Sequence, residues 1–178
     1  MEAVFFVVVG MLTIAHSDYM LGRVGAKALG LAGALVAIVL LALVLFQPVP
    51  MYTEASNTAL VTLMLVWAIA GAVAAGAYLY GYDERMVGNH ALGLAVVSLF
   101  LGIYFLIGDW TDSATISYPA GAATLLLAIV AATTYLVAVL RSPFVLPKQF
   151  VGLVTMVSGA VVLIIGLLAL VGVVELAA

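Results

Sequence analysis

The chain has 178 residues, of which 67% are hydrophobic and 7% are charged, and its mean hydropathy is +1.38. Soluble domains carry about 25% charged residues, so this composition excludes a soluble protein. Eight acidic and five basic residues give a net charge of -3 without any basic cluster, which excludes nucleic acid as a partner.

Six apolar segments are long enough to cross a membrane, which requires about 20 residues of helix. They lie at about 3–21, 25–47, 57–80, 90–108, 119–140 and 149–174, separated by short connections rich in turn and polar residues. The first segment lacks the basic stretch of a secretory signal, so we expect it to remain in the mature protein. The sequence therefore predicts an all-α integral membrane protein with a single six-helix transmembrane domain over residues 1–178.

The basic residues all fall in the first, third and fifth connections, whereas the two ends and the other connections carry only acidic residues. Cytoplasmic loops of membrane proteins are enriched in Lys and Arg. We therefore expect a multi-pass protein of the cell (inner) membrane with both termini outside the cytoplasm. The basic residues are Arg23, Lys27, Arg85, Arg141 and Lys148.

An internal repeat follows three of these basic residues. The string GAKALGLA at Gly25–Ala32 recurs as GNHALGLA at Gly88–Ala95, and a looser version, KQFVGLV, occupies Lys148–Val154. Such a pattern predicts a two-helix hairpin used three times around a shared axis, which would be a central pore. The alternative interpretation is that strings of Gly, Leu and Ala recur by chance in apolar sequence.

The central parts of the predicted helices contain polar residues but no Asp, Glu, Lys or Arg. Without an intramembrane carboxylate or cation, the chain lacks an obvious proton relay, counter-ion or voltage sensor, which favours a neutral solute over ions. His16 has the chemistry to hydrogen-bond an amide-like solute, or to be a satisfied structural histidine. Trp67 is either a flat pore wall or filler between helices. The inward polar set also includes Thr13, Ser17, Ser98, Tyr104, Thr133, Thr134, Tyr135, Thr155 and Ser158.

Neither metal chemistry nor catalysis is expected. The chain has no cysteine and its two histidines are far apart in sequence, so we expect no metal ion and no cofactor. His16, Ser17 and Asp18 are adjacent and so point in different directions on a helix, which is the wrong arrangement for a catalytic triad. We therefore do not expect an enzyme.

Several short motifs resemble the AmiS/UreI family of bacterial urea and short-chain amide channels. Val9-Gly10, His16 and Leu21-Gly22-Arg23 have the spacing of the family's Val-Gly, Asn and Leu-Gly-Lys, which puts His16 at the Asn position. Asp83-Glu84-Arg85 resembles its Asp-x-basic motif, and Leu140-Arg141-Ser142-Pro143 resembles its Leu-Lys-x-Pro turn. The motifs occur in the family's order over most of the chain.

The resemblance implies three two-helix hairpins around a pore, both termini outside and a hexameric ring of copies. It also implies a passive channel whose partners are membrane lipids and a small neutral solute such as urea or an uncharged amide. The family's pore tryptophans in the fifth helix are replaced here by Thr124, Leu127 and Ala131, so the choice of solute stays open. The outside connections contain no histidine, so we predict no acid gating there. The pore residues implied are Phe6, Val9, Thr13, His16, Trp67, Thr124, Leu127, Ala131 and Ser158.

Two other classes of function compete with the channel. One is a non-conducting structural or assembly protein whose small residues serve only to pack against partner helices. The other is a proton- or ion-coupled transporter that uses Asp18 and His16 near one membrane face.

Overall fold

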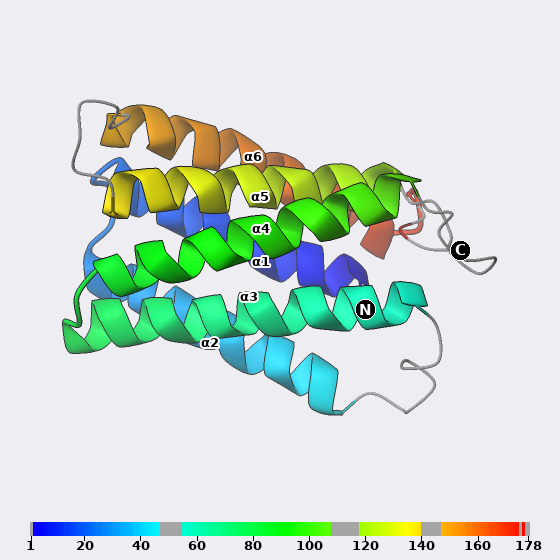
Figure 1. The fold of residues 1–178 in the computed structure, drawn as a ribbon, viewed down its shortest axis with the longest axis horizontal. Coiled ribbons are helices and arrows are strands. Elements are labelled where there is room, and N and C mark those ends of the chain that lie inside the picture. Colours follow the sequence, from blue (N-terminus) through cyan, green and yellow to red (C-terminus); the bar gives the residue numbers. More distant parts are fainter. Residues whose placement is uncertain (1, 47–54, 108–117, 140–146, 175, 177–178) are drawn as a thin grey trace.

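A computed structural model describes residues 2–46, 55–107, 118–139, 147–174 and 176, with the backbone alone for residues 55–57. Over these residues the chain forms helices and no strand, as predicted, and each helix is long and apolar enough to cross a membrane. The protein is therefore a multi-pass membrane protein. The helices are α1 (Glu2–Met20), α2 (Ala26–Leu45), α3 (Ala55–Tyr80), α4 (Arg85–Ile107), α5 (Tyr118–Ala138) and α6 (Lys148–Leu170) (Figure 1).

Two helix ends differ from the predicted bounds by more than two residues, and each has a local cause. Helix α4 begins at Arg85 instead of residue 90, because the Asp83 carboxylate accepts the Arg85 backbone N–H at 2.9 Å and caps the first turn. Helix α6 ends at Leu170 instead of residue 174. Gly172 there has a φ of 74°, and the Val173 N–H donates to the Leu168 carbonyl at 2.9 Å, which is a Schellman ending.

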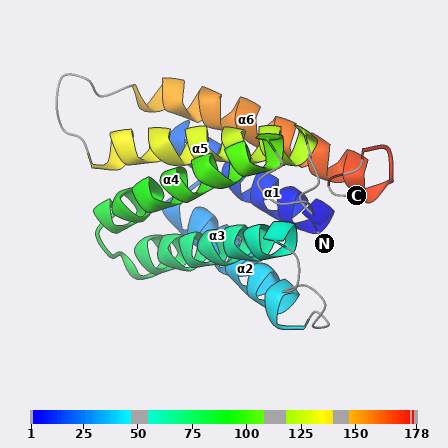
Figure 2. The same cartoon turned by 45° about the vertical axis from the view of Figure 1, so that its right-hand side comes forward.

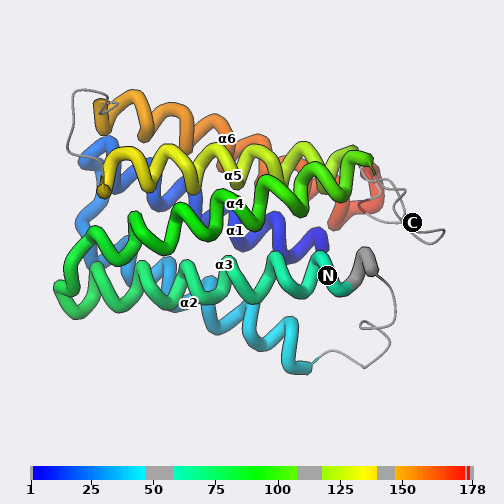
Figure 3. Tube along the Cα trace, viewed as in Figure 1, coloured from blue at the N-terminus to red at the C-terminus, as the bar shows by residue number. Residues whose placement is uncertain are grey.

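The helices form a closed ring of hairpins, which confirms the predicted architecture. Successive helices run antiparallel, so α1 begins and α6 ends at the same end of the bundle (Figure 3). Packing is closest between α2 and α3, between α4 and α5, and between α6 and α1, and it is looser within the pairs α1–α2, α3–α4 and α5–α6. The chain therefore repeats one arrangement three times, and the α6–α1 pair closes the ring.

The odd-numbered helices form the inside of the ring. Helices α1, α3 and α5 are more buried than α2, α4 and α6, whose exposed faces are covered with large apolar side chains. In two views, α1 lies behind α4 and between the α5–α6 and α2–α3 pairs (Figures 1 and 2). The residues of α1, α3 and α5 that face one another therefore determine what lies along the axis.

Glycine allows the three close pairs to approach backbone to backbone. A Cβ added to Gly33 of α2 would lie 2.7 Å from the Gly71 carbonyl oxygen of α3. A Cβ on Gly121 of α5 would lie 3.1 Å from the Gly102 carbonyl oxygen of α4, and one on Gly10 of α1 would lie 2.8 Å from the Leu163 backbone nitrogen of α6. Small residues at such crossings are the usual means of helix association in lipid.

The burial pattern corrects the register of the internal repeat. The buried residues of α2 correspond to buried residues 58 positions later in α4: Gly30, Gly33, Val36, Ala37 and Leu40 pair with Gly88, Ala91, Leu94, Ala95 and Ser98. The glycine strings were matched at an offset of 63 instead. Accordingly, Gly25 precedes α2 in open space, whereas Gly88 lies within α4 against Ala138 and Val139. The GAKALGLA and GNHALGLA strings therefore indicate that α2 and α4 are repeated elements, but residues at the same place in the two strings are not structurally equivalent.

We expect Gly33→Ala to destabilise the protein by about 1–3 kcal/mol, because the added methyl group meets the α3 backbone. Gly93 is the matched control, because it also lies in a helix and has nothing within 4 Å of an added Cβ. Gly93→Ala should be neutral or stabilising by up to about 1 kcal/mol. Thermal unfolding in detergent, followed by circular dichroism, measures both effects, and equal midpoints for the two variants would contradict the role of the α2–α3 crossing.

Candidate functional site

The axis of the ring is lined at successive levels by one residue from each of α1, α3 and α5. The burial pattern recurs 58 residues later from α1 to α3 and 60 residues later from α3 to α5. Each level consequently has three residues at one depth of the bundle, and the sizes of their side chains decide whether the axis is filled or open. From the start of α1 onward the levels are Phe6, Met64 and Thr124; Val9, Trp67 and Leu127; Leu12, Ala70 and Val130; and His16, Ala74 and Thr134.

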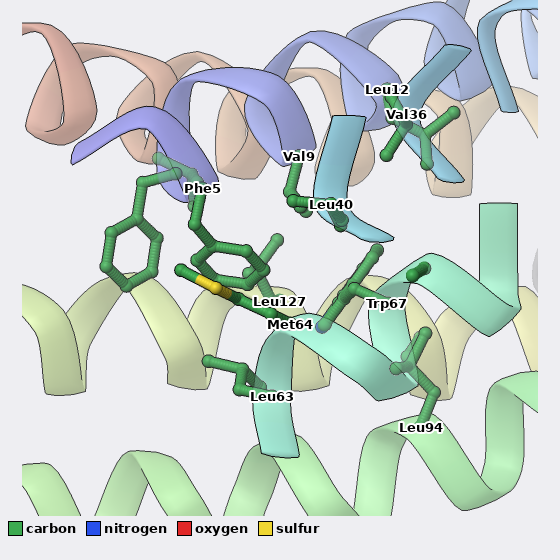
Figure 4. Packing of buried hydrophobic residues seen from close by; sticks show 14 of the residues in the cluster. Phe5, Val9, Leu12, Val36, Leu40, Leu63, Met64, Trp67, Leu94 and Leu127 are labelled. Carbon is green, nitrogen blue, oxygen red and sulfur yellow. The ribbon is translucent and has the colours of Figure 1, made fainter. Parts of the chain in front are cut away.

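The half of the axis toward the start of α1 is filled by apolar side chains, which we call the plug. Its members are fully buried, and the rings of Phe5 and Phe6 meet edge to face with centroids 5.0 Å apart. Figure 4 shows Phe5, Met64 and Leu127 gathered between the helices. The plug consists of Phe5, Phe6, Val9, Leu63, Met64 and Leu127.

The other half of the axis contains a cavity of about 70 Å³, which we call the axial cavity. One water occupies about 10–15 Å³ of such space, so the cavity has room for several waters or one urea-sized molecule. The lining contains no Asp, Glu, Lys or Arg, and its polar side chains come from Thr13, His16, Trp67, His90 and Thr134. The rest of the lining is apolar: Leu12, Leu29, Ala70, Val73, Ala74, Val87, Ala91, Leu94, Val130 and Ala131.

Hydrogen bonds orient two of the polar groups in the wall. The Thr134 hydroxyl donates to the Val130 carbonyl oxygen at 2.8 Å, and the Thr134 oxygen lies 3.3 Å from Nε2 of His16. A hydroxyl group has one hydrogen, so His16 Nε2 donates to Thr134 in one tautomer and accepts from it in the other. On the other side, Trp67 Nε1 donates to the Ser98 hydroxyl of α4 at 3.3 Å. The indole of Trp67 is thereby held at the boundary between the plug and the axial cavity.

His90 is the remaining polar group of the wall, and it differs from the others. Its Nε2 atom is buried and has no hydrogen-bond partner among the described residues. The early start of α4 at Arg85 places His90 more than one turn inside the helix. His90 therefore contributes to the lining of the axial cavity from the α4 side, while its Nε2 atom itself is buried.

A second cavity of about 80 Å³ adjoins the first at the end where α1, α3 and α5 finish. It shares Val87 and Thr134 with the axial cavity, and Lys148 also lines it. The Tyr19 hydroxyl donates to the Glu84 carboxylate there at 2.6 Å. Charged groups thus begin where the bundle ends, and we call this region the mouth.

The structure brings some of the predicted pore residues together and places the others elsewhere. Thr13, His16, Trp67 and Ala131 line the axial cavity. Phe6, Val9 and Leu127 belong to the plug, and Thr124 is buried at the same level as Phe6, with its hydroxyl bonded to the Ala120 carbonyl oxygen. Ser158 is buried in α6 and is not part of the lining.

Sequence reasoning missed His90 as a site residue. The predicted helix began at residue 90, which left the imidazole at the membrane boundary. The available signal was Asp83, because an Asp two residues before Arg85 is a typical helix cap. Among the described residues no cluster of His, Cys, Asp or Glu has the geometry to hold a metal ion.

Six helices that could span a membrane, arranged around an axial cavity, place the protein in the class of polytopic membrane proteins with a cavity inside the bundle. No protein-family model matches the sequence, and a search of curated proteins finds no match. The fold is similar to the crystal structure of the urea channel from the human gastric pathogen Helicobacter pylori, with a TM-score of 0.73 and 16% identity over 97% of this chain and 98% of that one. The cryo-EM structure of the Helicobacter pylori urea channel in its closed state gives a TM-score of 0.70, with 16% identity over 96% and 98% of the two chains. The chain therefore shares the urea-channel fold.

We expect Ser98→Ala to change the fluorescence of Trp67, because the indole N–H loses its acceptor. In a Trp110→Phe background Trp67 is the sole tryptophan, and its emission maximum should shift to the blue. Ser17→Ala is the control, because that hydroxyl is equally buried but donates to Gly152 in another part of the bundle. An unchanged spectrum in Ser98→Ala would mean that the indole does not depend on this bond.

Proposed function

We propose that the protein is a passive channel for urea or another small uncharged amide-like solute, which passes along the axis of the ring. The observation that carries the proposal is the axial cavity inside a urea-channel fold, whose mostly apolar lining has a few hydrogen-bonding side chains and no Asp, Glu, Lys or Arg. Enzymatic activity and a cofactor form no part of this proposal.

The chemistry of the wall suits a neutral solute. An ion that leaves water needs compensation from charge or from a ring of carbonyl groups, and the axial cavity offers no charged side chain. Urea needs less compensation on leaving water, because it carries no net charge. Its carbonyl oxygen and N–H groups exchange hydrogen bonds with water for hydrogen bonds with the wall. Thr13, His16 and Thr134 supply such groups, and the flat indole of Trp67 matches a flat amide.

The proposal includes the orientation of the chain in the membrane and the assembly of its copies. The described basic residues lie at one end of the bundle, at the mouth, where α2, α4 and α6 begin. The positive-inside rule puts this end in the cytoplasm of a cell with an inner membrane, and both termini outside. The apolar outer faces of α2, α4 and α6 would contact lipid and other copies of the chain, in a hexameric ring if the assembly follows the family resemblance.

The plug supports a second candidate, a non-conducting structural protein. Fully buried side chains fill half of the axis, and a protein that serves only to pack against partner helices needs no path through it. For a channel, the same plug would be a closed gate, and the urea channel of Helicobacter pylori has a closed state with this fold. The two candidates differ in whether any solute crosses.

The first experiment measures solute entry into proteoliposomes by light scattering, with urea, acetamide and glycerol in parallel. We expect urea or acetamide to enter faster than into empty vesicles, and His16→Ala and Trp67→Ala to change the rate without loss of folded protein. Phe100→Ala is the control, because Phe100 is 70% exposed on the outer face of α4. If no solute enters faster than into empty vesicles, the structural candidate replaces the channel, whereas a voltage-driven or pH-driven current would point to ion transport.

We further expect Phe6→Ala to raise urea entry above the wild-type rate, because it removes a fully buried ring from the plug. The truncation should also cost about 3–5 kcal/mol of stability, so gel filtration must first establish that the variant is folded. Met64→Ala tests the same level of the axis from α3. A folded Phe6→Ala variant that is no more permeable than the wild type would mean that the plug is not the barrier.

A further inference from the structure

The starting observation is the position of two tyrosine rings at the mouth. The recurrence of 58 and 60 residues that defines the levels of the axis continues to the ends of α1, α3 and α5, where it gives a level of Met20, Tyr78 and Ala138. All three residues line the mouth, and so does Tyr19, which precedes Met20 in the last turn of α1. A solute that moves along the axis between the axial cavity and this end of the bundle therefore passes the two tyrosines.

Contacts on two sides hold Tyr19 across part of the mouth. The ring centroids of Tyr19 and Tyr78 lie 5.0 Å apart, which is contact distance for aromatic side chains. The Tyr19 hydroxyl donates to the Glu84 carboxylate, in the connection between α3 and α4, at 2.6 Å. The side chain is thereby held against α3 by its ring and against the connection by its hydroxyl, so it covers the α1–α3 side of the mouth.

The hydrogen bond between Tyr19 and Glu84, which we call the latch, can open at small cost. Glu84 is exposed and Tyr19 is partly exposed, so water replaces either partner when the bond breaks. Among the described residues no salt bridge holds the Glu84 carboxylate. Tyr78 differs, because its side chain is buried in the hydrophobic core. Of the two tyrosines, Tyr19 is therefore the one that can leave the mouth by rotation of its side chain.

We propose that Tyr19 is a gate at the mouth. With the latch closed, its ring lies against Tyr78 and narrows the passage between the mouth and the axial cavity. With the latch open, the side chain turns toward water and the passage widens. The plug and this gate then lie on opposite sides of the axial cavity. The gate controls access to the cavity, so it goes beyond the proposed function and does not depend on which solute crosses.

The test uses the fact that the chain contains no cysteine. Ala74→Cys introduces a single thiol into the lining of the axial cavity. Its reaction with methyl methanethiosulfonate in detergent is followed by mass spectrometry, with and without Tyr19→Phe or Glu84→Ala. Each of these two substitutions removes one partner of the latch. Tyr82→Phe is the matched control, because Tyr82 is an exposed tyrosine in the connection between α3 and α4.

We expect Tyr19→Phe and Glu84→Ala each to raise the rate of thiol modification by about twofold to tenfold, which corresponds to the loss of one hydrogen bond. The two substitutions together should raise it no further, because they break the same bond. Tyr82→Phe should leave the rate at the parental value. Parental rates in both single variants, or fully additive effects in the double variant, would overturn the gate.

The thiol assay requires no transport, so its outcome is separate from that of the proposed function. If urea and acetamide fail to enter proteoliposomes but the latch variants speed the thiol reaction, the channel is refuted and the gate stands. If the solutes enter and the latch variants react at the parental rate, the gate is refuted and the channel stands. Should Ala74→Cys not fold, Ala70→Cys provides a thiol in the same lining one turn earlier in α3.

Discussion

The structure depends on the close approach of helix backbones at glycine. In lipid the helices gain little from burying apolar surface, since the surrounding chains are equally apolar, and association rests on packing at short range. The three tight pairs use Gly33 against Gly71, Gly102 against Gly121, and Gly10 against the α6 backbone. Each of these pairs joins one hairpin to the next, so the ring closes only because all three crossings are close. The axis and everything on it follow from that closure.

The open and the filled halves of the axis follow from side-chain size at equivalent levels. At the level of Val9, Trp67 and Leu127, three large side chains lie at one depth, and they are buried together with Phe5, Phe6, Leu63 and Met64. One level further, Ala70 lines the axial cavity with Leu12 and Val130, and then Ala74 does so with His16 and Thr134. The ring has a similar helix arrangement throughout, so the loss of side-chain volume from α3 and α5 creates the cavity. Thus the same threefold scaffold holds a plug and a cavity in series.

The sequence was sufficient to predict the spans, the hairpin repeat and part of the lining, because apolar length and small-residue content act locally. The sequence was not sufficient to align the residues of α2 with those of α4. Strings such as GAKALGLA match by composition, whereas the depth of a residue in the bundle is set by the packing of its helix against the neighbouring helix. His90 illustrates the consequence: the Asp83 cap starts α4 early and puts the imidazole inside the helix, although the predicted helix began only at residue 90. Ser158 illustrates the reverse, because a polar residue in an apolar helix turned out to lie away from the cavity wall.

The separation of charge from the axial cavity bears on selectivity. The Glu84 carboxylate and the Lys148 amine lie at the mouth, and the lining beyond it toward the plug contains no Asp, Glu, Lys or Arg. A cation or anion that reaches the mouth meets charged groups only there, and further entry would remove it from water without a charged partner. The same step costs a neutral amide less free energy, because it carries no net charge and the few hydroxyl and imidazole groups of the wall replace part of its hydrogen bonds with water. Exclusion of ions would then come from the chemistry of the wall, and the size of the cavity would select among the neutral solutes that remain.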